Sequence, residues 1–510
     1  MRRRSANLTF CRFSLDHRNL LIVPLLAAVA TSGCGPVTAF VPFPAQKQAL
    51  IAGQKAGSET AGGASTTIPQ NPEEKPAENA SATVPVATRT ETHTVARGES
   101  LQSLSFHYLP QTPYMTRAEF EAAIRQANPN KTGKYLRPGD QIVIPNLFAV
   151  PLVEKPVPVP KDFEMRGIYL TGYMAGSDQG LELIRHWREA GGNAVVFDIK
   201  DFDGLVNVPF DHPFTPQRKS VPIRNLPKLV HFLHSLRLHA IARIALFRDE
   251  ALAHSHKELA VQSRRSGDAW KESGKLVWVD PSQPQVQDYG LALARMAATS
   301  GADEIQFDYV RFPAEGEQED ARFAFEASHP DWKRSEVISR FTARAYSELH
   351  PLGVLFSLDV FGVMAWQSAV DLEHTGQDIP AMARSCDVLS PMVYPSHFFR
   401  MDGYDHPGDA PEHFISRSMQ RFTEITADSK VVLRPWLQAF AWHTKTYSDA
   451  YICTQVSVAK GNGGVGFLFW NANNDYAKLF SAMSEMRATP GRFFRGDEIQ
   501  TNIRIYLSRM

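Results

Sequence analysis

The sequence predicts an α/β protein built mainly as a (β/α)8 barrel of the TIM type, with a small separate β-α-α-β module ahead of it. Three observations lead to this prediction. From residue 164 onward, short β-branched runs alternate with amphipathic helical stretches, which is typical of βαβ units in a parallel sheet. Eight such runs follow one another, which suits a closed barrel. Ahead of the eight runs lies a short stretch with the pattern of an ordered domain, and a low-complexity segment flanks it on each side.

The predicted strands lie at residues 167–171, 194–200, 240–247, 304–311, 354–361, 388–394, 431–440 and 465–471. Apolar residues three or four apart predict the helices between them; Leu181, Ile184 and Trp187, for example, share one helix face. A doubly wound open sheet is the alternative, but no Gly-rich phosphate loop follows the first strand. We assign residues 164–490 to the barrel and residues 491–510 to a C-terminal tail.

Residues 1–34 have the character of a bacterial export signal. Several arginines precede an apolar run at 20–30 that is too short to span a bilayer as a stable anchor. The run ends in Thr31-Ser32-Gly33-Cys34, which resembles a lipobox, in which the thiol of Cys34 becomes lipidated. Thr31 stands where leucine is usual, so simple cleavage is the alternative. We expect an exported cell-envelope protein: a membrane-anchored lipoprotein or, on the alternative, a periplasmic or secreted protein.

Two segments read as linkers. Residues 35–92 hold few large apolar side chains beyond residue 53 and cannot offset the entropy of ordering, so a disordered tether is expected. Residues 147–163 carry four closely spaced prolines, which favours a stiff, extended spacer.

Composition excludes some functions. The 54 basic residues balance 54 acidic ones, which argues against a nucleic-acid binder. The four cysteines show no metal-ligand spacing, and the sequence leaves a bridge between Cys386 and Cys453 open. Because no His/Asp/Glu cluster has metal spacing either, we expect no required metal and no cofactor.

The module at residues 93–146 is defined by three sequence blocks, at 93–101, 123–129 and 136–145. In type and order these blocks resemble the LysM module, and the resemblance implies binding of N-acetylglucosamine glycans such as peptidoglycan and chitin. The chain departs from the pattern at 108–117, which reads as an insertion between the two helices. A LysM fold that no longer binds glycan is the alternative.

The predicted strand ends of the barrel are unusually polar, and active sites of such barrels lie at the C-terminal ends of the strands. Carboxylates, an arginine and aromatic rings together suit carbohydrate chemistry, because rings stack on sugars and paired carboxylates serve as acid and nucleophile or base. In chain order these residues are Asp198, Lys200, Asp201, Arg248, Asp249, Asp308, Tyr309, Arg311, Asp359, Tyr394, His397, Trp436, Gln438, Trp470 and Asn471.

Five blocks, at 196–201, 304–313, 359–362, 390–397 and 434–438, resemble the bacterial family named for a putative glycoside hydrolase domain. The resemblance covers about residues 164–486 and implies a barrel with glycosidase chemistry and no assigned substrate. Chitinase-like barrels carry Asp-x-x-Asp-x-Asp-x-Glu on the fourth strand, where this chain has Gln306 and Val310 at two of the positions. Amylase-like barrels have an arginine where this chain has Gln306. Neither mechanism transfers whole.

For catalysis we expect Asp308 as nucleophile or base and Asp359 as general acid, with a pKa raised by its surroundings at Phe361 and Trp366. Arg311 is expected to keep Asp308 ionised. Asp198, with Lys200 as its partner, is a third catalytic candidate. Structural ion pairs and loop-capping carboxylates are the alternatives.

The substrate-binding candidates are strand-end residues that can bond or stack on a sugar: Lys200, Arg311, Tyr394, Trp436, Gln438, Trp470 and Asn471. Large aromatic residues at strand ends are as often part of the barrel core. A single histidine in a loop, such as His397, more often has no role as a ligand or proton donor. We expect a glycoside hydrolase acting on a cell-envelope or extracellular polysaccharide, guided by the LysM module. A non-catalytic glycan-binding protein is the main alternative, and a deacetylase on the same barrel is a weaker one.

Overall fold

The computed structural model describes residues 87–129, 131 and 135–495. The predicted signal, Cys34, nearly all of the tether and residues 496–510 lie outside this part. Within it, no helix combines the length and the apolar character needed to cross a membrane.

The N-terminal module is a small unit with its own core. It consists of β1 (Thr88–Thr94), α1 (Leu101–Tyr108), η1 (Leu109–Gln111), α2 (Arg117–Ala127) and β2 (Gln141–Phe148), with β1 antiparallel to β2. Capping boxes at Ser100 and Thr116 begin the two α-helices. Phe120 and Ile142 are fully buried in its core. The order of elements is the predicted β-α-α-β, while the identity of the module as LysM stays a prediction.

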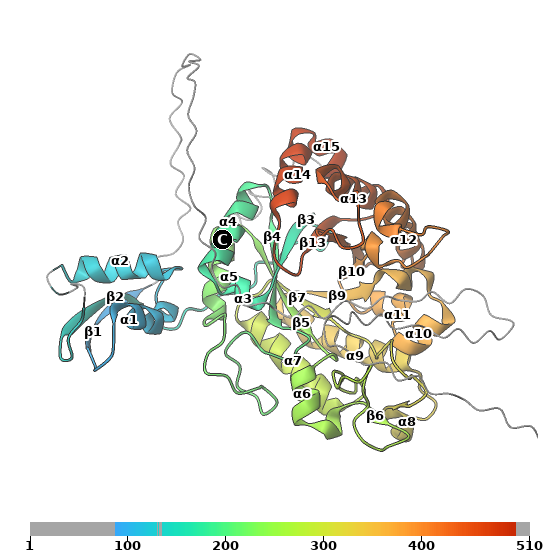
Figure 1. Cartoon of the computed structure of the whole chain (residues 1–510), viewed down its shortest axis with the longest axis horizontal. Coiled ribbons are helices and arrows are strands. Elements are labelled where there is room, and N and C mark those ends of the chain that lie inside the picture. Colours follow the sequence, from blue (N-terminus) through green and yellow to red (C-terminus); the bar gives the residue numbers. More distant parts are fainter. Residues whose placement is uncertain (1–86, 130, 132–134, 496–510) are drawn as a thin grey trace, which may run out of the picture. The chain divides into compact units, whose positions relative to one another are not determined.

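The predicted (β/α)8 barrel is confirmed (Figure 1). All its strand pairs are parallel, and β9 pairs with β10 while β13 pairs with β3, so the sheet closes. A short strand β11 (Val432–Leu433) opens the seventh position and is separated from β12 by Arg434-Pro435, because proline has no N–H for the ladder. The eight positions are β3 (Met165–Leu170), β4 (Ala194–Lys200), β5 (His239–Ala245), β7 (Glu304–Asp308), β9 (Leu355–Phe361), β10 (Val388–Met392), β12 (Trp436–Gln438) and β13 (Gly466–Trp470).

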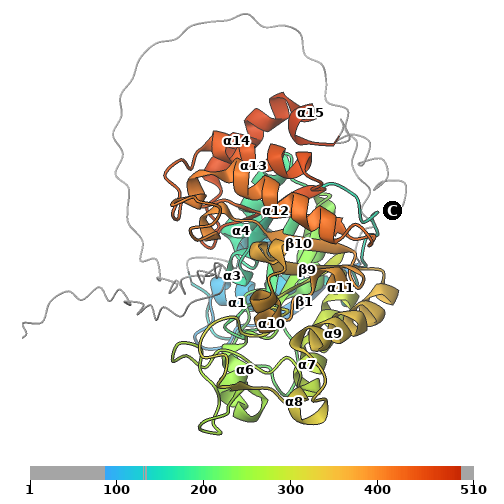
Figure 2. The same ribbon diagram turned by 90° about the vertical axis from the view of Figure 1, so that its right-hand side faces the viewer.

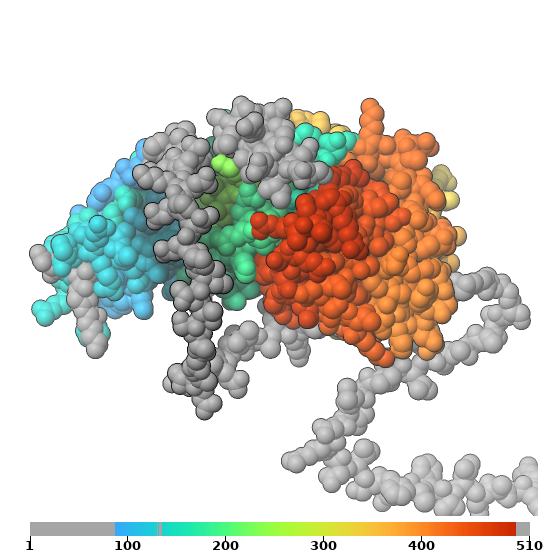
Figure 3. All heavy atoms as spheres, turned by 90° about the horizontal axis from the view of Figure 1, so that it is seen from above, coloured from blue at the N-terminus to red at the C-terminus, as the bar shows by residue number. Residues whose placement is uncertain are grey.

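Helices cover the outside of the barrel and bury its main core between themselves and the strands. Figure 2 shows α7 and α9 side by side, and Figure 3 shows α12 to α15, in orange and red, as one continuous surface. The helices are α3 (Gly172–Ala175), α4 (Asp178–Glu189), α5 (Leu226–Ser235), α6 (Glu250–Ser255), α7 (Pro284–Thr299), α8 (Phe325–Ser328), α9 (Arg334–Leu349), α10 (Ala369–Thr375), α11 (Ile379–Ala383), α12 (Pro411–Ile425), α13 (Asp449–Gly461), α14 (Ala477–Ala488) and α15 (Pro490–Phe493).

Short elements complete the loops. The 3-10 helices are η2 (Lys257–Leu259), η3 (His350–Leu352), η4 (Gly362–Trp366), η5 (Pro395–His397) and η6 (Pro407–Asp409). The enlarged loops after β5 and β7 are joined by a two-stranded antiparallel ladder of β6 (Gln262–Ser263) and β8 (Ala321–Arg322).

Strand β7 shows how the polar interior arises from sequence. Alternate residues of a strand point to opposite faces. Ile305 and Phe307 join the core beneath the helices, whereas Glu304, Gln306 and Asp308 form the other, equally buried face of β7. A row of polar groups therefore runs along the inside of the barrel and ends at its C-terminal mouth.

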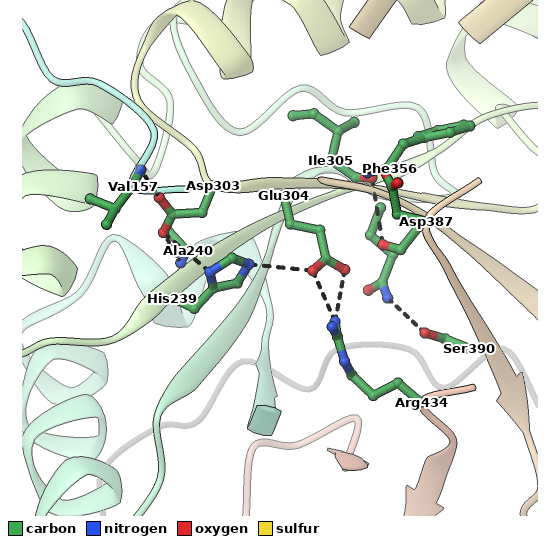
Figure 4. A network of polar contacts seen from close by, with 12 residues as sticks. Val157, His239, Ala240, Asp303, Glu304, Ile305, Phe356, Asp387, Ser390 and Arg434 are labelled. Carbon is green, nitrogen blue, oxygen red and sulfur yellow. Dashed lines mark hydrogen bonds and ion pairs between the residues drawn. The ribbon is translucent and has the colours of Figure 1, made fainter. Parts of the chain in front are cut away.

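The N-terminal end of the barrel holds a paired set of charges, which we call the floor network: His234, His239, Asp303, Glu304 and Arg434. Arg434 contacts Glu304 at 2.9 Å, and both side chains are fully buried. His239 bonds Glu304 at 3.3 Å, and His234 bonds Asp303 at 3.0 Å. Figure 4 shows His239 between Asp303 and Glu304, with Arg434 facing Glu304.

The Pro-rich segment is attached to this floor. Residues 151–160 form no helix or strand. Val157 donates its N–H to Asp303 at 2.6 Å, and Glu154 bonds both His231 and His234 of α5 at 2.8 Å (Figure 4 shows the Val157 contact). The predicted spacer is therefore hydrogen-bonded to the barrel along part of its length and does not extend freely from it.

Cys386 and Cys453 are both free and buried. The disulfide that the sequence leaves open is therefore absent from the structure.

Candidate active site

The mouth of the barrel is organised around one guanidinium, that of Arg243 on β5. It pairs with Asp198, with Asp308 at 2.5 Å and with Asp359 at 3.7 Å. Among the described residues, Arg243 is the cation in ion-pair contact with all three, and we call these four residues the mouth cluster. Sheet register explains the meeting, since Asp198 lies beside Arg243 and Asp308 beside Ala245 on neighbouring strands.

Each carboxylate is also held by a neighbouring donor. Tyr169 donates its hydroxyl to Asp198, and the Trp436 indole N–H donates to Asp359 at 2.7 Å. The backbone N–H of Tyr309 donates to Asp308 at 2.6 Å. Asp198 and Asp359 are 0% and 1% exposed, whereas Asp308 is 8% exposed. Asp308 is thus the one of the three that lies nearest to solvent.

Negative charge exceeds positive charge in the mouth cluster, and the pKa values reflect it. Burial raises the pKa of Asp198 to about 7, against the pull of Arg243. Burial, followed by the charge of Asp308, raises the pKa of Asp359 well above its usual value. The predicted direction for Asp359 is confirmed, and a second carboxylate contributes to it. The mouth cluster therefore holds buried carboxyl groups whose raised pKa values favour the protonated form, a feature that acid–base chemistry uses.

Asp308 and Asp359 contact different nitrogens of one planar guanidinium. Because that group is small, their oxygens lie no farther apart than the upper limit of roughly 9.5 Å for the carboxylate pair of an inverting glycosidase.

The backbone is strained beside the pair. Tyr309 has a φ of 51°, in the left-handed region that a bulky residue rarely adopts. This turn points the N–H of Tyr309 at the carboxylate of Asp308. Strain of this kind is retained where the surrounding structure enforces it, and it gathers at functional sites.

Arg311 is not in ion-pair contact with Asp308, the carboxylate that it was predicted to keep ionised. Arg311 donates to the carbonyl of Phe312 at 3.0 Å, and its guanidinium lies over the rings of Trp278 and Phe361 at 4.6 and 4.2 Å. The physical reason is the left-handed turn at Tyr309, which redirects the chain before Arg311. The ion pair of Asp308 is made by Arg243, which the sequence reasoning missed. Its signal was a charged residue on the inward face of a buried strand.

The predicted pairing of Lys200 with Asp198 is also wrong. Lys200 pairs with Asp249 at 2.8 Å and donates to the carbonyl of Ala245 at 2.6 Å. A register shift between Asp198 and Lys200 separates the two side chains. Lys200 is 1% exposed and bonded to Asp249 and Ala245, so the geometry does not support its predicted contact with substrate.

Two further polar candidates, Gln438 and Asn471, form hydrogen bonds to residues of the loop that follows β12. Gln438 donates to Thr444 and to the carbonyl of Phe440, at 2.9 and 2.8 Å. Asn471 donates to the carbonyl of Ala439 at 2.6 Å. Their polar atoms are engaged inside the protein, so the geometry does not support the predicted substrate contacts.

The aromatic candidates form one wall of the mouth. The ring of Trp470, which is half-buried, lies 6.0 Å from that of Tyr394 and 6.2 Å from that of Tyr169, a residue that was not among the predicted candidates. Trp436 is 2% exposed and serves as the donor to Asp359, so it acts as a positioning group rather than a platform. Trp470 is the aromatic best placed to meet a sugar ring.

In the described part of the chain, no group of three or more His, Cys, Asp or Glu residues is arranged to hold a metal ion. The chemistry available at the mouth is that of the carboxylates, Arg243 and the aromatic side chains.

A family model described as "Putative glycosyl hydrolase domain" matches residues 167–476. No curated protein matches. Similar solved structures include a hypothetical protein from Ruminiclostridium thermocellum, at 33% identity and a TM-score of 0.34 over 38% of this chain and 97% of that one.

Two other similar structures have lower identity. The PgaB (BpsB) glycoside hydrolase domain from Bordetella bronchiseptica is 14% identical with a TM-score of 0.47, over 66% of this chain and all of that one. A chitinase from Chromobacterium violaceum is 15% identical with a TM-score of 0.40, over 64% of this chain and 99% of that one.

Proposed function

The chain belongs to this family of glycosyl hydrolase domains, and on that premise we propose that it hydrolyses the glycosidic bonds of a cell-envelope or extracellular polysaccharide. The observation that carries the proposal is the pair Asp308 and Asp359 on one guanidinium, in unequal environments. Asp359 is buried with a raised pKa, whereas Asp308 makes the close ion pair. Unequal environments of this kind divide the roles of acid and base between two carboxylates.

In the proposed reaction, Asp359 donates its proton to the glycosidic oxygen as the bond from that oxygen to the anomeric carbon breaks. Asp308 either attacks the anomeric carbon, giving a glycosyl ester that water then hydrolyses while Asp359 takes back a proton from that water, or takes a proton from the water that attacks the anomeric carbon directly. Arg243 holds both carboxylates in place, and Asp198 with Tyr169 fixes Arg243 from the other side.

The test is release of reducing ends from a glycan panel by the full chain. We expect Asp308→Asn to lose activity by at least about 10²-fold, since the isosteric amide removes the anionic oxygen. Asp331→Asn is the matched control, because Asp331 is exposed and lies outside the mouth. No release from any glycan by the wild-type chain would falsify the proposal.

A second candidate is a non-catalytic glycan-binding protein. It is favoured by the near-complete burial of Asp359, at 1% exposed, since a general acid must reach its substrate. Retained glycan binding without reducing-end release would establish this second function.

We further propose that the module at residues 93–146 brings the barrel to N-acetylglucosamine glycans, and that a lipid on Cys34 attaches the exported protein to a membrane. The three ordered sequence blocks and the β-α-α-β order support the first part, and the lipobox-like Thr31-Ser32-Gly33-Cys34 supports the second. Sedimentation of the protein with insoluble peptidoglycan tests the first. Transfer of Cys34→Ala from the membrane to the soluble fraction tests the second, and unchanged partition contradicts it.

A further inference from the structure

A pocket lies at the ends of β9 and β10, beside the mouth cluster. Its empty volume of about 300 Å³ includes open solvent, so the enclosed part is small, on the scale of a methyl group rather than a sugar ring. Its lining consists of Phe361, Gly362, Val363, Met392, Tyr394, His397 and Phe398. None of these side chains takes a chemical role in the proposed hydrolysis.

Strand register places the pocket directly beyond the carboxylate pair. Asp359 lies beside Ser390, and two residues farther along the same strands Phe361 lies beside Met392. Two residues of a strand span about 6–7 Å. The charges of Asp359 and Asp308 also act on the Tyr394 hydroxyl. A sugar ring over the carboxylates would therefore direct a substituent into this pocket.

The lining is apolar with two neutral polar groups. Phe361, Val363, Met392 and Phe398 present hydrocarbon and a thioether. Burial lowers the pKa of His397 to about 3 and raises that of Tyr394, so the imidazole and the phenol are both uncharged at neutral pH. None of the seven lining residues brings a charge into the pocket.

The pocket wall is tightly packed at Gly362. A Cβ on that residue would come within 2.5 Å of the Met392 carbonyl oxygen and 3.1 Å of the Phe398 ring. Glycine thus allows β9 and β10 to approach closely here, and the wall is formed before any ligand arrives.

We propose that this pocket receives the N-acyl group, an acetamido group, of an amino sugar bound at the carboxylate pair. The inference rests on the proposed glycosidase function and specifies its substrate class. The methyl group of an acetamido matches the apolar lining, while its neutral amide matches the hydroxyl of Tyr394 and the imidazole of His397. A carboxylate, as in a uronic acid, would lose its water there without gaining a cation.

The experiment compares initial rates of the full chain on matched oligomers, β-1,4- and β-1,6-linked, of N-acetylglucosamine and of glucosamine, alongside the glycan panel. We expect at least about 10-fold faster cleavage of an N-acetylated oligomer, the scale on which an apolar pocket discriminates by a small group. Val363→Phe, which fills the pocket from its half-buried wall, should remove that preference. Val370→Phe makes the same change on exposed α10 and should leave it intact.

The outcomes separate this inference from the function on which it rests. Equal rates on N-acetylated and free amino oligomers, or cleavage confined to glycans without N-acyl groups, overturn the pocket assignment and leave the glycosidase standing. If no glycan is cleaved, titration of the N-acetylglucosamine hexamer decides. Binding that is weaker for Val363→Phe than for Val370→Phe supports the pocket, and equal binding by the two variants overturns it, because any contribution of the N-terminal module is common to both.

Discussion

The two ends of the barrel interior carry charged networks built on the same strands. The floor network lowers the pKa of its buried carboxylate, whereas the pKa values of the buried carboxylates at the mouth are raised. At the floor, burial tends to raise the pKa of Glu304, but Arg434 and His239 lower it to about 2 (Figure 4). At the mouth, Arg243 contacts four carboxylates, Asp201 at 3.7 Å in addition to the three of the mouth cluster, and the pKa of Asp198 rises to about 7. Burial is similar at both ends, so the ratio of cations to carboxylates makes the difference.

This contrast separates structural from functional charge. A matched buried pair holds its groups in one state, because removing either partner leaves an uncompensated charge. In a cluster where carboxylates outnumber cations, one carboxyl group retains a proton that can be transferred. This arrangement costs stability and is typical of active sites. By this criterion the floor network is structural, and the mouth cluster is where we propose that catalysis takes place.

The largest expected effect is at the mouth. Replacing Asp359→Asn removes the proposed acid and should lower kcat/KM by about 10²–10⁴-fold. Stability should stay level, since an amide of the same shape replaces a carboxyl whose raised pKa already favours its neutral form. Rates on the cleaved glycan and urea unfolding at pH 7 measure the two quantities. Full activity in a folded Asp359→Asn protein contradicts the assigned role.

The matching change at the floor should act on stability instead. Arg434→Met leaves Glu304 buried without its ion pair and should cost about 3–5 kcal/mol of unfolding free energy. Arg340→Met, at an exposed i,i+4 pair, is the control and should cost less than about 1 kcal/mol. Addition of Glu304→Gln to Arg434→Met should restore part of the loss. An Arg434→Met protein as stable as the Arg340→Met control would contradict the structural role assigned to the floor network.

The two networks should also give opposite pH dependences of stability. Asp198 has a pKa raised on folding to about 7, so it favours the folded state fully below its unfolded value, near 4, and this contribution is lost as pH rises toward 7. Glu304 has a pKa lowered to about 2, so its contribution is present above about 4.5 and is lost as pH falls toward 2. Each effect is on the order of 3–4 kcal/mol.

Urea unfolding between pH 2 and 8 measures these slopes. Asp198→Asn should flatten the decline between pH 4 and 7, and Glu304→Gln should flatten the decline below pH 4.5. If both variants change the same limb of the profile, the two ends of the barrel are not distinct in the way proposed.

Much of the barrel was predictable from the sequence, because strand and helix periodicity is local. Strand β4 has the predicted bounds, 194–200, and Asp198, Asp308 and Asp359 were recognised as strand-end carboxylates. The single predicted strand at 431–440 appears as two pieces, because Pro435 interrupts the ladder.

The pairing of charges was not predictable, because it depends on register between strands that are distant in sequence. Arg243 lies in an apolar run and meets its partners only when β4, β5, β7 and β9 are aligned. A one-residue irregularity after Asp198 sends Lys200 to Asp249. A single positive φ at Tyr309 takes Arg311 away from Asp308. Neither irregularity has a signature in residue type.

The smallest expected effect concerns the hydrogen bond from Trp436 to Asp359 and its influence on the pKa of Asp359. The Trp436 indole N–H bonds the Asp359 carboxylate and lowers its pKa, against the burial that raises it. Trp436→Phe keeps an aromatic ring but removes the donor, so the pKa of Asp359 should rise further. The basic limb of the kcat/KM profile, where a general acid loses its proton, should then move to higher pH, with about a 10-fold change in rate at the optimum. A purely structural role for Trp436 would alter stability and leave the limb in place. A limb that moves while the unfolding free energy stays unchanged shows that the donor acts on the proton of Asp359.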